Sequence, residues 1–176
     1  HSSEWIDAWN GQQPTDALHG FSAGGHWSLS DRLTWNAHVA QSQRVPGLSE
    51  LLSSGIHHCA FRFEQGDVEL QKETSFNLET NLHWHGHLLN FEGSVYRNAI
   101  ENYVLIAPTW QVEQDYALFQ WQATDALFRG GEVAASLNES HAEHWMAQVA
   151  WSWVEASDSE GQALPLIPPM STRAML

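Results

Sequence analysis

The histidines of this chain are numerous, and some are spaced so that their side chains could bind a metal ion together. Eleven histidines stand among 21 acidic and seven basic residues, which give a formal net charge of −14. His83, His85 and His87 recur at every second position, so a strand that ran through Gly86 would point all three to one face. Imidazoles on one face can ligate zinc. Residues two positions apart are separated by about 7 Å, however, and such a row could equally line a wetted polar rim.

A second candidate cluster is the run His57, His58 and Cys59, with Glu50 and Glu64 nearby in the sequence. Thiolate and imidazole both favour zinc, so a histidine–cysteine group in an exposed loop would suit capture of that ion. The alternative is that Cys59 is a small apolar residue and that both histidines are only solvated. The candidate metal ligands of the two clusters are His57, His58, Cys59, His83 and His85.

The composition and the motifs argue against other chemistries. Lys72 is the only lysine, whereas nucleic-acid binding depends on clustered Lys and Arg. The chain has no G-x-S-x-G, H-E-x-x-H or phosphate-binding glycine motif. His141, Glu143 and His144 form H-x-E-H in a predicted turn, which is too short for a helical zinc-hydrolase site. We therefore expect no enzymatic activity and no nucleic-acid partner.

The elements that must position these residues are β-strands, because apolar and polar residues alternate over most of the chain. No stretch approaches the roughly 18 consecutive apolar residues that a membrane-spanning helix needs. The pattern predicts about seven strands, joined as an antiparallel up-and-down meander. Pro108 is expected to end the fourth strand and to open a loop of about a dozen residues. Gly130 and Gly131 are expected to form a bulge or bend in the fifth strand.

The connections between the strands distinguish two all-β folds. Short connections lie near Ser30, Gly86 and Asn138, and longer ones begin at Arg44, Pro108 and Ser157. A transmembrane barrel has short turns at one rim and long loops at the other, whereas a soluble β-sandwich has no reason to sort its loops by end.

Four tryptophans near the short turns favour the barrel. They are Trp27, Trp35, Trp84 and Trp145. On the apolar face of their strands they would form an aromatic girdle at one rim, although they could also fill a sandwich core. The sequence thus predicts an all-β segment of a transmembrane β-barrel. The alternative is a soluble β-sandwich module that binds metal or carbohydrate, and a lesser one is part of a passive porin or adhesin barrel.

The stretch from Arg44 to Glu79 carries a resemblance to a known family. It contains an R-x-P-x-x-x-E-L motif, a G-D-x-x-L-x-x-E-x-S motif and an N-L-E motif in that order. Their residues are Arg44, Pro46, Glu50, Leu51, then Gly66, Asp67, Leu70, Glu73, Ser75, then Asn77, Leu78 and Glu79. Leu48 to Leu52 also predicts a short helical turn. This order of motifs resembles the barrels of TonB-dependent outer-membrane receptors.

Three later segments extend the resemblance over roughly residues 20–176. They are the segment from Ser94 to Tyr103, the segment ATDALFRGGE from Ala123 to Glu132, and the segment LPLIPP from Leu164 to Pro169. The resemblance implies a barrel of about 22 strands with a plugged lumen. It also implies energised uptake of a metal ion or metal chelate, such as zinc or an iron–siderophore, across the outer membrane of a Gram-negative bacterium.

The resemblance sets further expectations for partners. Residues 1–176 are expected to form part of one barrel domain without the plug domain, in contact with outer-membrane lipid. Coupling to the TonB energy system is expected to pass through an N-terminal part outside this sequence. The loop from Ser53 to Asp67 is most similar to the zinc-import branch, so the resemblance makes zinc one expected cargo beside an iron–siderophore. Zinc would be a transported ligand and not a resident cofactor.

Overall fold

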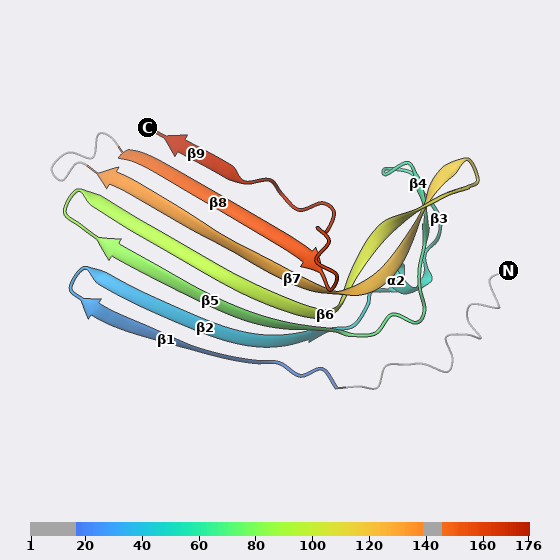
Figure 1. Ribbon diagram of the computed structural model, residues 1–176, viewed down its shortest axis with the longest axis horizontal. Helices are drawn as coiled ribbons and strands as arrows, with labels where there is room; N and C mark the ends of the chain where they lie inside the picture. Colours follow the sequence, from blue (N-terminus) through green and yellow to red (C-terminus); the bar gives the residue numbers. More distant parts are fainter. Residues whose placement is uncertain (1–16, 139–145) are drawn as a thin grey trace.

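The computed structural model describes residues 17–138 and 146–176, most of which lie in β-strands (Figure 1). The elements are β1 (Phe21–Ser30), β2 (Leu33–Arg44), α2 (Leu48–Leu52), β3 (Ser54–His57), β4 (Arg62–Gln65), β5 (Glu73–His85), β6 (Leu89–Glu113), β7 (Tyr116–Asn138), β8 (Met146–Asp158) and β9 (Ser171–Met175). Trp145 and the H-x-E-H motif at 141–144, both singled out above, lie outside the described residues. Among the described residues, no helix is long and apolar enough to cross a membrane.

Seven strands form the predicted antiparallel meander in the order β1-β2-β5-β6-β7-β8-β9. The two remaining strands of the described part, β3 and β4, form a hairpin within the long connection between β2 and β5. There β4 pairs in parallel with residues Ala117–Gln120 of β7, which is the one parallel pairing of the described strands. The prediction of an all-β antiparallel fold is confirmed, and so is the helical turn at Leu48–Leu52.

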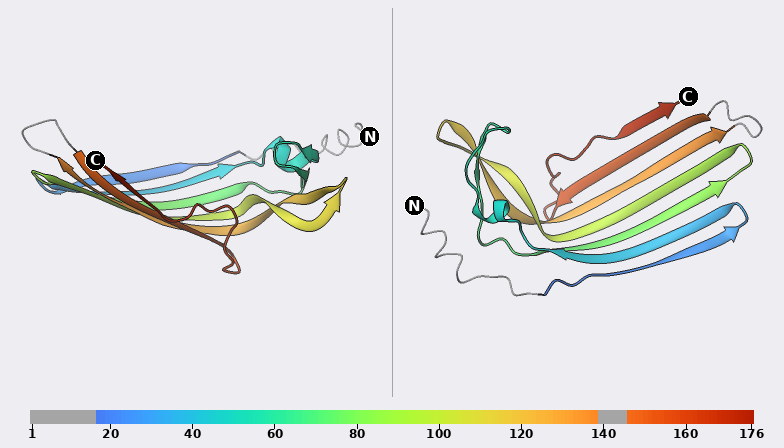
Figure 2. Two further views of the ribbon diagram at one scale, coloured as in Figure 1. Left: turned by 90° about the horizontal axis from the view of Figure 1, so that it is seen from above. Right: turned by 180° about the vertical axis from the view of Figure 1, so that it is seen from behind.

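The strands make one curved sheet that stays open in the described part of the chain (Figures 1 and 2). Short turns join β1 to β2 and β5 to β6 at one end, which we call the turn end. At the other end, which we call the loop end, α2 and the β3–β4 hairpin stand beside the projecting tips of β6 and β7. The two described short turns thus share one end, and the long β2–β5 connection lies at the other, as the barrel prediction requires.

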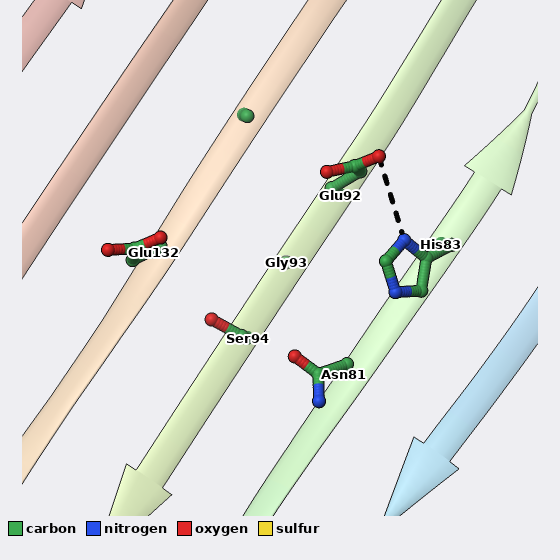
Figure 3. Close-up of a pocket in the computed structure, with 7 residues that line it drawn as sticks. Asn81, His83, Glu92, Gly93, Ser94 and Glu132 are labelled. Atoms are coloured by element: carbon green, nitrogen blue, oxygen red, sulfur yellow. Dashed lines mark ion pairs between the residues drawn. The ribbon is translucent and has the colours of Figure 1, made fainter. Parts of the chain in front are cut away.

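The sheet has two chemically different faces. The side on which Trp27 stacks on Trp35, with ring centroids 4.6 Å apart, is here the apolar face. The indole N–H of Trp35 donates to the hydroxyl of Thr80 at 2.6 Å, so it is satisfied within that face. The opposite side is the polar face. Its residues Asn81, His83, Glu92, Ser94 and Glu132 lie on β5, β6 and β7 (Figure 3).

The open sheet contradicts the β-sandwich alternative. A sandwich would bury Trp35, Phe76, Phe91 and Trp151 between two layers, whereas Trp35 and Phe76 are 38% and 43% exposed. Within the described residues, no large side chain is fully buried. A single layer whose apolar face is left uncovered by residues 17–138 and 146–176 matches the wall of a barrel, whose outer face meets lipid.

The prediction that Pro108 ends a strand is wrong. Strand β6 runs on to Glu113, and a two-residue turn at Gln114 and Asp115, both with positive φ, leads directly into β7. Pro108 pairs with Phe119 immediately before a register shift, and a proline is tolerated where the regular ladder is interrupted. The expected loop of a dozen residues is thus a projecting hairpin.

The predicted bulge at Gly130 and Gly131 is also wrong, because the pairing of β7 with β6 and β8 is continuous through both residues. These glycines instead make room for neighbouring atoms. A Cβ on Gly130 would lie 2.5 Å from the ring of Tyr96, and one on Gly131 would lie 2.8 Å from the carbonyl oxygen of Ser94. Their small size is needed for close packing across the two faces.

Candidate functional site

A network of hydrogen bonds at the loop end joins three of the motif residues. The Arg44 guanidinium donates to both carboxylate oxygens of Glu73 at 2.7 and 2.8 Å, and its third nitrogen donates to Glu50 at 2.8 and 3.1 Å. Glu50 also accepts from the N–H of Gly47 at 2.6 Å, and Glu73 accepts from the N–H of Val104 at 2.7 Å. Arg44 therefore fastens the end of β2 to α2 and β5, and Glu73 links β5 to β6.

The network shifts the pKa of both partners at its centre. Burial by itself raises the pKa of Glu73, but the hydrogen bonds from Arg44 and Val104 and the charge of Arg44 outweigh it. The pKa of Glu73 therefore lies below its ordinary value. The hydrogen bond to Glu73 raises the pKa of Arg44 above its ordinary value, against the effect of burial and with support from Glu50. Arg44 ends β2 and Glu73 begins β5, so both lie nearer the loop end than Phe76 of the apolar face. Both are charged at neutral pH.

The lowered pKa of Glu73 predicts acid sensitivity of the loop end. A carboxylate whose pKa is lower in the folded state stabilises that state above its unfolded pKa, about 4.3 for glutamate. This stabilisation is lost as the pH falls from there through the folded pKa. The free energy of unfolding of the chain in detergent should fall with pH below about 4.3, and Glu73→Gln should flatten that dependence. Equal slopes for the two proteins would contradict the assignment.

The polar face holds the first candidate cluster beside a shallow depression of about 150 Å³ (Figure 3). His83 on β5 lies opposite Glu92 on β6, with its Nδ1 3.7 Å from a carboxylate oxygen. His85 lies opposite Asn90, with its Nδ1 3.4 Å from the amide oxygen. Strand β5 ends at His85, so His87 lies in the turn and does not extend the row. The predicted placement of His83 and His85 on one polar face agrees with the pairing register.

The second cluster lies at the tip of the β3–β4 hairpin. His57 is the last residue of β3, and its Nδ1 accepts a hydrogen bond from the N–H of Ala60 at 3.2 Å. His58 and Cys59 follow in the exposed turn. The two clusters are at opposite ends of the sheet, because β5 starts at the loop end and reaches His83 and His85 only at the turn end (Figure 1).

The carboxylates near the hairpin are already engaged by arginines. Glu64 is only 8% exposed and accepts a hydrogen bond from Arg62 at 2.8 Å, and Glu50 belongs to the Arg44 network. In the part of the chain that the structure describes, no three His, Cys, Asp or Glu side chains come together as a metal site. Either cluster would therefore need ligands from the cargo or from elsewhere to complete a coordination shell.

Comparison with known proteins identifies the fold family. The family model described as TonB dependent receptor-like, beta-barrel matches residues 7–175. Of the solved structures, the copper transporter OprC superposes with a TM-score of 0.75 at 22% identity, over 90% of this chain and 24% of that one. The siderophore receptor PirA from Pseudomonas aeruginosa gives a TM-score of 0.62 at 18% identity, over 79% and 28%.

A third structure, the FrpB iron transporter from Neisseria meningitidis, gives a TM-score of 0.53 at 16% identity, over 79% of this chain and 20% of that one. The chain thus spans about a quarter of the length of the structures that it matches. Identities this low show a common fold, and these three proteins are named for copper, a siderophore and iron rather than for zinc. The match over nearly the whole sequence shows that this chain belongs to the TonB-dependent receptor β-barrel family.

Proposed function

We propose that the chain is a section of the barrel wall of an outer-membrane receptor that takes up a metal ion or metal chelate with energy from the TonB system. The observation that carries this proposal is the single-layer sheet, which combines an uncovered apolar face with a polar face that bears histidine and glutamate side chains. Family membership supports it further. In a Gram-negative outer membrane the apolar face contacts lipid and the polar face lines the lumen.

The sorted connections orient this wall in the membrane. Outer-membrane barrels have short turns on the periplasmic side and long loops on the extracellular side. The loop end, with α2 and the β3–β4 hairpin, is then at the extracellular mouth. The Arg44 network holds this region in place. TonB itself acts from the periplasm, through parts of the receptor other than this wall.

The two histidine clusters act as successive metal contacts in this proposal. His57, His58 and Cys59 meet the cargo at the mouth, where thiolate and imidazole favour a borderline or soft transition metal. His83 and His85 lie further along the lumen face. Each cluster is too sparse to hold a resident metal, which suits a cargo that must bind and then leave.

Removal of the mouth cluster should weaken metal binding. We expect the triple variant His57→Ala, His58→Ala, Cys59→Ser to bind Zn²⁺ at least about tenfold more weakly, because the loss even of a residue that only orients a ligand costs about 10–100-fold in metal affinity. Isothermal titration of the reduced, detergent-folded chain measures this. His19→Ala, at an exposed position before β1, is the matched control. Wild-type affinity for Zn²⁺ in the triple variant would refute the role of the cluster.

A further inference from the structure

Three charged residues follow one another across the outer half of the apolar face. Arg97 on β6 pairs directly with Arg129 on β7, and Arg129 pairs directly with Glu155 on β8. All three are exposed. The chain has only seven basic residues against 21 acidic ones, so the direct opposition of two arginines is conspicuous.

Contacts at the neighbouring position show which face these residues share. A Cβ on Gly131 would lie 3.2 Å from Cγ1 of Val95 and 3.2 Å from the indole nitrogen of Trp153. Val95, Gly131 and Trp153 are therefore side by side on the apolar face. Residues two positions along a strand return to the same face, so the charged row lies beside them, one step nearer the loop end.

The row lies past the middle of the apolar band of a barrel wall, on the side of the loop end. Arg97 is six residues from Phe91 of the turn end, or about 20 Å along the strand and about 15 Å in height at the usual barrel tilt, in a band that is about 25 Å tall. Long arginine stems can extend further and bring their guanidinium groups to the interface.

The row lacks an internal partner for one of its two positive charges. Like charges directly opposite on a sheet repel each other, and one glutamate cannot neutralise two arginines. Within the described residues, neither Arg97 nor Arg129 makes an ion pair within 4.0 Å, whereas Arg44 and Arg62 both do. An anion between the two guanidinium groups would relieve this repulsion.

We propose that Arg97 and Arg129 form a binding site for the phosphate of a membrane lipid headgroup. Guanidinium groups match phosphate oxygens in charge and in their forked geometry. The acyl chains of the lipid would lie over the apolar face toward the turn end. The site rests on the proposed membrane placement but is independent of the metal cargo.

Native mass spectrometry of the full chain in neutral detergent tests this site, with phosphatidic acid and phosphatidylcholine as probes. We expect the double variant R97Q/R129Q to retain phosphatidic acid at least about tenfold less than wild type, the ratio that a pair of charge-assisted hydrogen bonds produces. The double variant R32Q/R173Q removes the same charge from the β1–β2 turn and from β9, and should retain the lipid as wild type does. Circular dichroism verifies that both variants are folded.

Several outcomes would overturn the lipid site. Equal losses in the two double variants would mean unspecific attraction by net charge, and equal retention of both lipids by wild type would mean that no phosphate group is recognised. Inorganic phosphate at millimolar concentration should not displace the lipid, and displacement would point to a free-anion site.

Metal titration of the same samples separates this proposal from the uptake function, because the arginine variants should bind metal normally. Failure of wild type to float with vesicles would count against both.

Discussion

Replacement of Arg44 by alanine is expected to destabilise the folded chain by about 2 kcal/mol, more than any other single charge removal. The change leaves the carboxylates of Glu73 and Glu50, whose side chains are 13% and 15% exposed, without their shared cation. Loss of one partner from a fully buried pair costs roughly 3–5 kcal/mol. We expect less here because the Arg44 side chain is 46% exposed and solvent screens part of the interaction. Urea unfolding in detergent, followed by circular dichroism, measures the difference.

Two matched variants make the Arg44 experiment specific. Arg44→Lys keeps the charge but cannot form the two-pronged contact with Glu73, so its stability should lie between those of wild type and Arg44→Ala. Arg32→Ala removes a charge from the β1–β2 turn, and among the described residues the Arg32 side chain makes no ion pair. This variant should change the free energy of unfolding by no more than about 0.5 kcal/mol. If Arg32→Ala were as damaging as Arg44→Ala, general charge balance rather than the network would explain the loss.

The sequence was informative about the sheet because period-2 alternation is a local signal. The hairpins around Asp31 and Gly86, and the faces of β2 and β5, follow from that alternation, and the pairing register bears them out. The motif residues Arg44, Glu50 and Glu73 were visible in the sequence, but their contact was not. They are up to 29 positions apart, and only the alignment of β2 with β5 brings Arg44 opposite Glu73.

The predictions from sequence were wrong where neighbouring strands override the usual structural preference of a residue. Pro108 normally marks the end of a strand, yet here it occupies an interrupted part of the ladder that needs no donor at that point. A Gly130-Gly131 pair in a strand normally indicates a bulge or bend, yet the pairing here is continuous and the Tyr96 ring on the neighbouring strand leaves room only for glycine at position 130. The wide separation of the two histidine clusters depends on the direction of β5. Metal binding by these two clusters stays a prediction.

A glycine that brings α2 against the sheet provides the second large expected effect. Gly66 follows β4, and a Cβ at this position would lie 2.6 Å from the carbonyl carbon and oxygen of Leu51 and 2.7 Å from the backbone nitrogen of Leu52. All three atoms belong to the backbone, so no side chain can rotate away. The N–H of Gly66 also donates to the carbonyl oxygen of Ser53 at 2.7 Å. The N–H of Asp67 donates to the backbone carbonyl oxygen of Glu50 at 3.0 Å.

Gly66→Ala should therefore push α2 away from β4, at a cost of about 2 kcal/mol, as for other overpacked positions. Amide hydrogen exchange of Gly66→Ala in detergent should show at least about tenfold faster exchange at Asp67, since about 1.4 kcal/mol corresponds to a factor of ten. Gly55→Ala on β3 is the matched control, because a Cβ there meets no atom within 4 Å. Unchanged exchange in Gly66→Ala would mean that the two segments are not held together in solution. Equal acceleration in Gly55→Ala would instead indicate that the hairpin tolerates no added side chain, so that close contact at Gly66 would not be the cause.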